Sequence, residues 1–519
     1  MSPKTAFIAS ITAAVVAAAS LTVFGAPAVD RTFVSNYENV LGTSLELKVH
    51  SADAAAAARA EKAVLDEIAR ASKILSSWDP SSEVSRWAKS KDTAVPVSAE
   101  LFEVLGLFDQ WRVKSHGALD ASAQAAIGVW KNAAANQRVP SSSEMSAAVQ
   151  AIRQQHWRLD AANRTATHLT DTPLVLASFT KSYIIDRAVT TALNVSGVNG
   201  VVLNIGGDIV ARGAVTEPVA IADPKDDAEN ATPMSEIALR DKTVATSGDY
   251  RRGVDIMGVH YSHIIDPRTG GTAEDVISST VVTTNATDAG ALATAFSILT
   301  PNESQALASS IPGTDYLLVL KDGTRISSRG WRQLEHSSPS ATARPRVVNA
   351  ARSKGVATAT QSNKDVWDPS MELAVNFEIP VLGGAAKRPF IAIWIEDADK
   401  FPVRTLALWY HEDRWLPEMK AWYRADKLRQ MSEKTSIVRS IGAATRPPGK
   451  YTMKWDGKDT DGQPVKPGKY TVYLESSREH GTYQLIRQEM TFTGKPQTFD
   501  FKPGTEVSGG SFEYRKVVK

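Results

Sequence analysis

Apolar and polar positions alternate or recur at helical spacing through the first part of the chain. Residues 34–49 alternate, which predicts a strand. Apolar residues then recur every three or four positions through residues 64–75, with Ser51 as the expected N-cap, and again through residues 101–111. The pattern therefore predicts one strand and two amphipathic helices before residue 112.

Five short apolar runs, bounded by glycine and polar residues, predict further strands. They occupy residues 201–205, 219–222, 237–239, 243–245 and 278–284. A helix that begins with a carboxylate and small residues is expected from Asp288 to Leu299. Mixed strands and helices of these lengths predict an α+β domain.

Residues 336–364 separate this domain from a second region. They are rich in Ser, Ala, Thr, Pro and Arg and have little apolar periodicity, which predicts a flexible linker. Strand patterns dominate after them, in residues 371–377, 390–395, 406–410, 451–455 and 469–474. The expected fold class is therefore an α+β domain followed by an all-β sandwich.

The second region carries an aromatic concentration and an acidic loop. We expect most of the aromatic residues in the sandwich core, with a docking surface for a partner as the alternative for the rest. They are Trp394, Trp409, Trp415, Trp422 and Tyr423. The loop of residues 456–462 superficially suggests calcium, but it lacks the glutamate that closes an EF-hand, so we expect a hairpin turn.

Composition narrows the class of protein. The chain has 519 residues, enough for two to four domains, and is 43% hydrophobic and 22% charged, as globular proteins are. Its formal charge of +2 does not favour a nucleic-acid binder or a strongly basic membrane protein. Because there is no cysteine, disulfides, thiolate metal sites and lipidation at a cysteine are excluded.

The N-terminus has the pattern of a secretory signal. Lys4 precedes an apolar run from residue 6 to 24, and Ala26-Pro-Ala28 supplies small residues for cleavage. An uncleaved membrane anchor is the alternative, because the run is just long enough to span a bilayer. We expect an exported, periplasmic protein whose mature chain starts near Val29.

Four polar, glycine-containing motifs follow one another between residues 200 and 294. They are Asn204-Ile-Gly-Gly-Asp208, Ala245-Thr-Ser-Gly-Asp-Tyr250, His263-Ile-Ile-Asp-Pro-Arg-Thr-Gly270 and Thr287-Asp-Ala-Gly-Ala-Leu-Ala-Thr294. Glycines let a ligand approach main-chain N–H groups closely, and the motifs also bring a histidine, carboxylates and hydroxyls. Each motif alone is typical of an ordinary turn, but together they indicate a phosphate or nucleotide site with a metal ion.

In this order the motifs resemble those of the ApbE family, the FAD:protein FMN transferases. The resemblance covers roughly Tyr37 to Trp331. It implies a magnesium-dependent enzyme that splits FAD, attaches FMN through a phosphoester to a threonine or serine of another protein, and releases AMP.

The resemblance also implies roles for individual residues. His263 would act in catalysis by taking a proton from the attacking hydroxyl, because imidazole titrates near neutrality. Ser178, Asp288 and Thr294 would hold Mg²⁺. The residues expected to bind FAD are Leu45, Trp78, Ala118, Leu119, Asp120, Lys181, Gly206, Gly207, Asp208, Ile264 and Ile265.

Two acids of the family pattern are missing. Val175 and Gly290 stand where the family has aspartates, and Ser182 replaces a glycine. Thr294 is kept, and the nearest carboxylate is Asp288, which either reaches the ion or caps the helix. Fewer charged oxygens should weaken the affinity for Mg²⁺.

The second region has a resemblance of its own. Its Trp-Asp-Gly and Pro-Gly-Lys-Tyr segments, at residues 455–457 and 467–470, resemble the immunoglobulin-like module of flagellar hook-capping proteins. They also resemble a predicted periplasmic domain of unknown function that is found with flavin transferases. We expect a signal peptide in residues 1–28, a flavin-transferase domain in 29–335, a linker in 336–364 and the sandwich in 365–519.

Three hypotheses follow for function. The first is an exported flavin transferase that modifies a membrane or exported redox protein. The second is a non-catalytic FAD-binding or flavin-carrier protein with a degenerate metal site, which Val175 and Gly290 motivate. The third, an adhesion or assembly protein dominated by the sandwich, is disfavoured by the flavin motifs.

Overall fold

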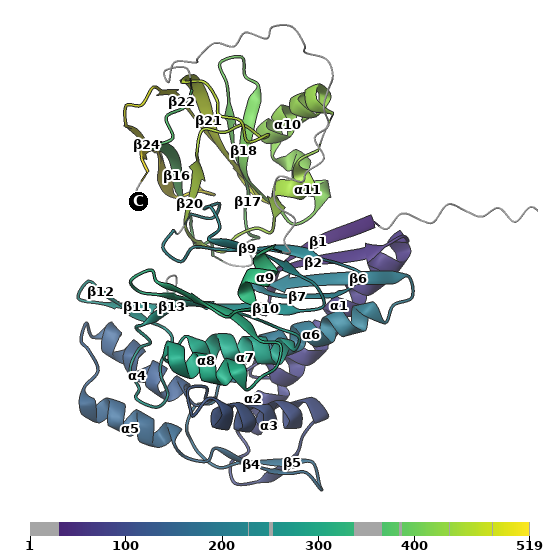
Figure 1. Cartoon of the computed structure of the whole chain (residues 1–519), viewed down its shortest axis with the longest axis vertical. Helices are drawn as coiled ribbons and strands as arrows, with labels where there is room; N and C mark the ends of the chain where they lie inside the picture. The colour runs from purple at the N-terminus through teal and green to yellow at the C-terminus, as the bar shows by residue number, and fades with distance from the viewer. Residues whose placement is uncertain are drawn as a thin grey trace, which may run out of the picture.

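The computed structural model describes residues 31–517, except residues 227, 249–252, 337–365, 384–386, 435 and 480. The expected signal segment and all but the first residue of the expected linker lie outside the described residues. The chain forms an N-terminal α+β domain and a C-terminal β-rich domain stacked on it (Figure 1). No helix among the described residues is long and apolar enough to cross a bilayer.

An eight-stranded antiparallel sheet forms the centre of the first domain. Its order is β1-β2-β6-β7-β10-β13-β14-β15. The strands are β1 (Arg31–Val40), β2 (Thr43–Ser51), β6 (Val198–Ile205), β7 (Asp208–Gly213), β10 (Thr243–Gly248), β13 (Val276–Thr283), β14 (Asp315–Leu320) and β15 (Arg325–Ser327). The predicted runs at 201–205, 243–245 and 278–284 lie in this sheet, the last as far as Thr283. The single strand predicted for residues 34–49 is instead two strands, β1 and β2, joined by a turn at Leu41 and Gly42.

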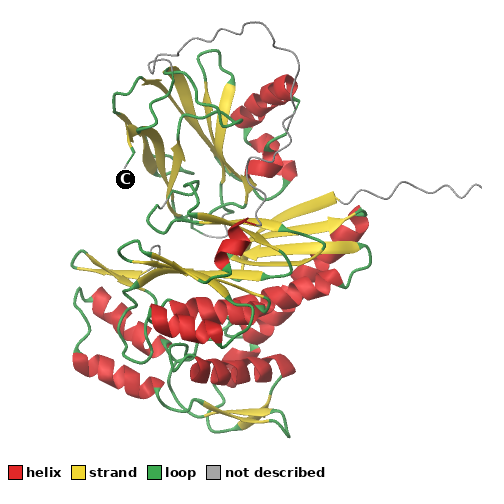
Figure 2. Cartoon of the chain, in the orientation of Figure 1, coloured by secondary structure: helices red, strands yellow, loops and turns green. Residues whose placement is uncertain are grey.

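Helices cover one face of the sheet (Figures 1 and 2). They are α1 (Ala54–Leu75), α3 (Ala99–Lys114), α6 (Thr180–Leu193), α7 (Ala286–Phe296) and α8 (Pro301–Ser309), and all five share one large core with the sheet. The N-cap of α1 is Asp53, whose carboxylate accepts from the N–H groups of Ala55 and Ala56. Ser51 was the expected cap; instead it ends β2, and its hydroxyl donates to the carbonyl of Gly197 at 2.7 Å.

The other face of the sheet carries a separate hairpin. Strands β8 (Glu217–Ile221) and β9 (Ser235–Leu239) pair only with each other, and α9 (Trp331–His336) packs beside them. The runs at 219–222 and 237–239 were expected to continue the main sheet. They are apolar because they cover it, with Val219, Ile221 and Ile237 buried against its outer face.

Smaller elements surround the domain. The three-stranded sheet β3 (Ala94–Pro96), β5 (Thr165–His168) and β4 (Trp157–Asp160) lies with α2 (Glu83–Trp87) at the end of the helical layer. The hairpin β11 (Gly253–Ile256) and β12 (Val259–Ser262) packs on α4 (Gln124–Ala135) and α5 (Ser142–Ile152). This last group positions the segment that follows β12.

The second domain is a β-sandwich. One sheet has the order β20-β16-β24-β23 and the other β19-β18-β17-β21-β22. The strands are β16 (Met371–Ile379), β17 (Phe390–Glu396), β18 (Pro402–Trp409), β19 (Gly442–Ala443), β20 (Gly449–Trp455), β21 (Gly468–Ser477), β22 (Tyr483–Phe492), β23 (Gln497–Phe501) and β24 (Gly509–Lys516). Trp367, Trp455, Phe492 and Tyr514 pack ring against ring between the sheets.

The loop of residues 456–467 joins different sheets. Strand β20 pairs with β16, whereas β21 pairs with β17 and β22, so the two strands that flank this loop do not form a hairpin with each other. The loop contains a tight turn closed by a bridge between Lys458 and Pro464. The sequence therefore predicted the turn and both strands, but not their partners.

Helices that the sequence did not predict stand outside the sandwich. They are η2 (Asp413–Glu418), α10 (Lys420–Glu433) and α11 (Val438–Ile441). Trp394 and Trp422 are buried in a second cluster between these helices and β17 and β18, while Trp409 lies in the sandwich core. The aromatic concentration is thus divided between two cores.

A loop of the first domain binds the edge strand β20 of the second. The Glu229 N–H donates to the carbonyl of Thr452 at 2.9 Å. The Asn230 side chain accepts from the Lys454 N–H at 2.7 Å and donates to the Lys454 carbonyl at 2.6 Å. Lys454 Nζ also pairs with Asp226 at 2.9 Å. The loop between β8 and β9 therefore pairs with β20 much as a neighbouring strand would.

Candidate functional site

A cleft of about 1380 Å³ opens in the first domain. It is lined by the β1–β2 turn, the β6–β7 turn, the end of β10, the start of α6, one face of α7 and the segment after β12. This volume exceeds that of a typical drug-sized site and suits a dinucleotide.

Two glycines form the β6–β7 turn. Gly206 and Gly207 have φ values of +57° and +90°, a backbone region that favours glycine. A Cβ on Gly206 would lie 2.6 Å from Cγ2 of Thr43, so a side chain is also excluded by contact. The Gly207 N–H donates to Asn204 Oδ1 at 3.1 Å. The turn thus brings backbone and Asp208 to the cleft wall.

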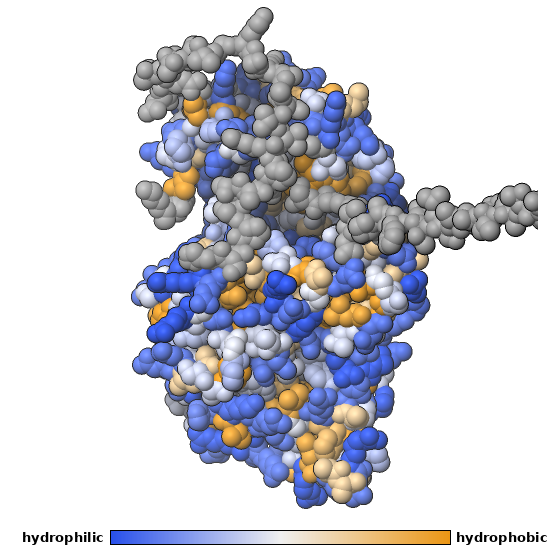
Figure 3. All heavy atoms as spheres, turned by 45° about the vertical axis from the view of Figure 1, so that its right-hand side comes forward, coloured by the Kyte–Doolittle hydropathy of each residue, from blue (hydrophilic) through white to orange (hydrophobic). Residues whose placement is uncertain are grey.

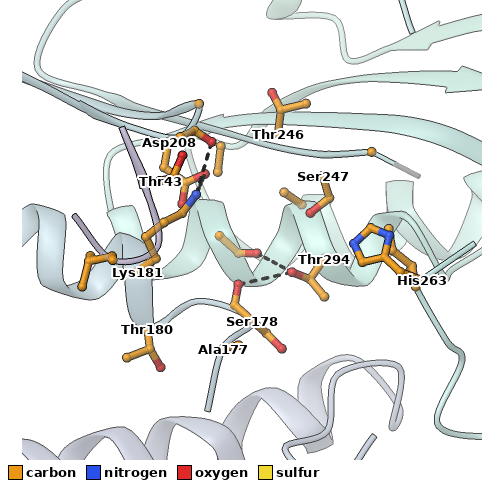
Figure 4. A pocket seen from close by; sticks show the side chains of 18 of the residues that line it. Thr43, Ala177, Ser178, Thr180, Lys181, Asp208, Thr246, Ser247, His263 and Thr294 are labelled. Carbon is orange, nitrogen blue, oxygen red and sulfur yellow. Dashed lines mark hydrogen bonds and ion pairs between the residues drawn. The ribbon is translucent and has the colours of Figure 1, made fainter. Parts of the chain in front are cut away.

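Asp208 is held by two neighbours on α6. Lys181 Nζ lies 3.3 Å from Asp208 Oδ1, and Ser182 Oγ donates to Asp208 Oδ2 at 2.7 Å. Lys181 Nζ also donates to the Gly206 carbonyl at 3.4 Å. Figure 4 shows the Lys181 side chain reaching along the cleft toward Asp208. A cation and a carboxylate are thereby fixed beside the glycine turn.

Three neutral oxygens gather on α7 and the segment before α6. Thr294 Oγ1 donates to the Ser178 carbonyl at 3.3 Å and to the Gly290 carbonyl at 3.1 Å (Figure 4). Hard oxygens of this kind suit Mg²⁺, which usually keeps waters and adds substrate phosphates to one or two carboxylates. No group of three or more His, Asp or Glu side chains among the described residues could hold a metal by itself. The set is of the kind that Mg²⁺ prefers but contains no carboxylate, so it would hold an ion only together with charged oxygens such as those of a bound diphosphate.

Asp288 does not line the cleft. It lies in the first turn of α7, whose N-cap is Asn285; the Asp288 N–H donates to Asn285 Oδ1 at 2.9 Å. Burial raises the pKa of its carboxyl, and Lys114 partly opposes this. The structure therefore separates Asp288 from Ser178 and Thr294, because residues six positions apart on a helix point to different sides. Nor does Asp288 cap the helix.

His263 lies on the other side of Thr294 from Lys181 (Figure 4). It directly follows β12, is exposed, and lines the cleft with Ile264 and Ile265. Figure 4 shows its ring on the same side as Ser247 and Thr294. Asp266 stabilises the segment: its carboxylate pairs with Arg268 at 2.9 Å and its carbonyl accepts from the Gly270 N–H at 2.7 Å.

The remaining expected flavin contacts divide into three groups. Trp78 lines the cleft with 74% of its surface exposed, so its ring is free to stack on a flat ligand. Ala118, Leu119 and Asp120 also line it, but the Asp120 carboxylate is bound by Arg112 Nε at 2.9 Å and the Ser122 N–H at 2.8 Å, which stabilises the loop. Leu45 was expected to contact the flavin, but it lies on β2 with its side chain fully buried in the core and does not line the cleft.

Four further residues line the cleft; two of them lie in the motif of residues 245–250, and the other two were not predicted from the sequence. Thr43, Thr246, Ser247 and Lys131 contribute hydroxyls and a cation to the cleft. Thr43 follows a turn in which Leu41 and Gly42 have positive φ; of these two residues, only the glycine was a signal for a turn in the sequence. Lys131 lies on α4, and nothing in its local sequence distinguishes it from any exposed helical lysine.

Comparison with known proteins gives two matches along the chain. Residues 41–318 match the ApbE family, and residues 372–509 match the family described as predicted periplasmic protein (DUF2271). The FAD:protein FMN transferase of Treponema pallidum is 29% identical over 317 residues, which cover 57% of this chain and 87% of the relative. That of Klebsiella pneumoniae is 25% identical over 294 residues, which cover 54% and 83%.

Solved structures of ApbE proteins are also similar to this chain. The ApbE protein of Thermotoga maritima is 26% identical with a TM-score of 0.53, over 59% of this chain and 99% of that one. The flavinyl transferase ApbE of Pseudomonas stutzeri, 24% identical with a TM-score of 0.50 over 59% and 97%, shares the fold.

Proposed function

The chain belongs to the ApbE family, and from this premise we propose that its first domain transfers FMN from FAD to a threonine or serine hydroxyl of an acceptor protein. The observation that carries the proposal is the single cleft lined by the Gly206–Gly207 turn, Lys181, Thr294 and His263. In the reaction the acceptor oxygen forms a bond to the FMN phosphorus, the bond to the bridging oxygen of the diphosphate breaks, and AMP leaves.

His263 is proposed to accept the proton of the acceptor hydroxyl. Its exposure at the mouth of the cleft supports this, because a protein acceptor must reach the reacting phosphorus from solvent. A neutral imidazole is a suitable base near pH 7.

Lys181 and the start of α6 are proposed to bind the diphosphate. The first turn of α6 presents backbone N–H groups at Thr180 and Lys181, both of which line the cleft. A helix N-terminus and an ammonium both favour phosphate oxygens. Trp78, Ala118, Leu119, Ile264 and Ile265 are proposed to contact the flavin end.

Mg²⁺ is proposed to be held by the Thr294 hydroxyl and the Ser178 carbonyl together with diphosphate oxygens. When bound, the ion supplies positive charge to the diphosphate and the departing AMP. Asp288 is left out of this set because it does not line the cleft.

The acceptor is proposed to be an exported or membrane redox protein, and the chain to act in the periplasm. The match of its second domain to a family of predicted periplasmic proteins supports the location. The N-terminal signal pattern supports export. The sandwich, in residues 365–519, would help to position the acceptor.

The test is an assay of the purified chain with FAD, Mg²⁺ and candidate acceptors, in which AMP release and in-gel flavin fluorescence are followed. AMP together with a fluorescent acceptor band is the expected result. FAD binding without AMP or a labelled band, across several acceptors and metals, would instead favour a non-catalytic flavin-binding protein. The observation that favours this second candidate function is that Val175 and Gly290 stand where the family has acids.

A further inference from the structure

The space beside Gly290 is already filled. A Cβ built on Gly290 would lie 2.4 Å from Ser182 Oγ, 3.1 Å from Ser182 Cβ and 3.3 Å from Phe179 Cα. Phe179 cannot yield, because it is fully buried and stacks on Phe108 at 4.3 Å between ring centroids. Any larger residue at position 290 therefore requires Ser182 to move.

Ser182 is held in place from its other side. It is 1% exposed, and its hydroxyl donates to Asp208 Oδ2 at 2.7 Å. Asp208 is 6% exposed and is also fixed by Lys181. A Cβ on Gly290 would thus lie 2.4 Å from Ser182 Oγ, which itself lies 2.7 Å from Asp208 Oδ2. The Asp208 carboxylate is therefore next to the space into which a side chain at position 290 would project.

We infer that Asp208, and not a residue of helix α7, supplies the carboxylate at the diphosphate and metal subsite. Ser182 and Gly290 form the matched pair that allows this. The inference rests on the proposed function for the identity of that subsite. A carboxylate has about four lone-pair positions, and the contacts to Ser182 and Lys181 use one on each oxygen. Asp208 therefore retains acceptor capacity toward an ion, while Ser182 orients it.

The pairing explains why two departures from the family pattern occur together. An aspartate at position 290 would collide with the Ser182 hydroxymethyl group, and a glycine at position 182 would leave Asp208 without its hydroxyl donor. Restoring the acid alone, as Gly290→Asp, therefore strains the helix pair and gives no functional ligand. Ser182→Gly with Gly290→Asp removes the two Ser182 contacts, at 2.4 and 3.1 Å, and leaves only the milder contact of 3.3 Å to Phe179 Cα.

The experiment is a Mn²⁺ titration of the full chain by electron paramagnetic resonance, with ADP present to supply the diphosphate and with thermal unfolding measured in parallel. Mn²⁺ is a suitable probe because it prefers the same octahedral oxygen sites as Mg²⁺. Asp208→Asn should weaken Mn²⁺ binding at least tenfold. Gly290→Asp alone should lower Tm and not tighten binding, whereas Ser182→Gly/Gly290→Asp should regain Tm and bind at least tenfold tighter than the unaltered chain.

The triple variant Ser182→Gly/Gly290→Asp/Asp208→Asn is the decisive one. It should recover the Mn²⁺ binding that Asp208→Asn loses, because the acid returns to α7. Asp322→Asn, in an exposed turn, is the matched control and should change nothing.

Three results would overturn the inference: unchanged binding in Asp208→Asn, no recovery in the triple variant, or a stable, tight-binding Gly290→Asp. Because metal binding and Tm need no acceptor, failure of AMP release would leave this inference standing and would count against the proposed function alone.

Discussion

At the scale of residues, the functional positions separate into those that a local motif fixes and those that packing fixes. The Gly206–Gly207 turn could be predicted, because its backbone conformation depends on the two glycines themselves. The partnership of Ser182 with Gly290 could not, because it exists only where α6 crosses α7. The position of Asp288 could not be predicted for a similar reason. It is close to Thr294 in sequence and was expected beside it, but it lies on a different side of the helix and does not line the cleft.

His263 gives a residue-scale prediction for the proposed transfer. His263→Gln removes the base but keeps a polar side chain of similar size at the cleft mouth. AMP release should fall by a factor of about 10² to 10⁴. The dissociation constant for FAD, measured by flavin fluorescence quenching, should change by no more than a few-fold.

His260→Gln is the matched control for that prediction. His260 lies on β12, the strand that directly precedes His263, and pairs with Asp255 at 2.8 Å, but it does not line the cleft. Its AMP release should remain close to that of the unaltered chain. Equal losses in both variants would remove His263 from its proposed role.

At the scale of elements, strands and helices could be predicted well and their partners less well. Apolar periodicity is local, so α1, α3, β6 and β13 follow from it. The pairing of β20 and β21 with different sheets depends on residues far along the chain. Helix α10 has few apolar residues, and N–H groups at its N-terminus donate hydrogen bonds to a strand of the sandwich.

The acceptor of these hydrogen bonds is Glu475 on β21. Its two carboxylate oxygens accept from the N–H groups of Ala421 and Trp422, at 2.8 and 2.6 Å, at the start of α10. The residue is fully buried, and burial raises the pKa of its carboxyl, partly opposed by these two hydrogen bonds. The folded protein therefore binds the Glu475 proton more tightly than the unfolded chain does.

A pH dependence of stability follows from this difference. A carboxyl with a raised pKa in the folded state contributes stability at pH values below the unfolded pKa of about 4.3, and that contribution is lost as pH rises through the folded pKa. The free energy of unfolding should thus fall with rising pH relative to that of Glu475→Gln, in urea titrations from pH 4 upward.

The exposed Glu489→Gln variant on β22 serves as the control for Glu475. Its difference from the unaltered chain should be nearly independent of pH. A Glu475→Gln difference that is equally flat would show that the burial of this carboxyl is not linked to folding.

At the scale of the whole molecule, the two domains are joined through the β8–β9 hairpin. One end of this hairpin, residues 219–222, lines the cleft, while the loop that follows binds β20. On the side shown in Figure 3, apolar side chains form scattered patches among polar ones. The sequence predicted two domains, but their contact could not be predicted, since it pairs the Asn230 and Lys454 side chains with groups on elements far apart along the chain.

Asn230→Ala combined with Lys454→Ala tests this contact. The double variant removes the Asn230 bonds to the β20 backbone and the ion pair with Asp226. Each lost hydrogen bond contributes about 1 kcal/mol, so the domains should unfold less cooperatively, with two separated transitions in calorimetry. Lys469→Ala, which removes an exposed ion pair elsewhere on the sandwich, should leave the calorimetric profile unchanged.

The side chain of Asn230 also has a consequence for solubility. An unpaired edge strand is a template on which other chains can add strands and aggregate, and proteins protect such edges with loops, charges or bulges. Strand β20 is the outer strand of its sheet, and Asn230 occupies the backbone N–H and C=O of Lys454 there. A sandwich expressed without the first domain would lose that cover, and its propensity to self-associate would rise with concentration even if every strand folded correctly.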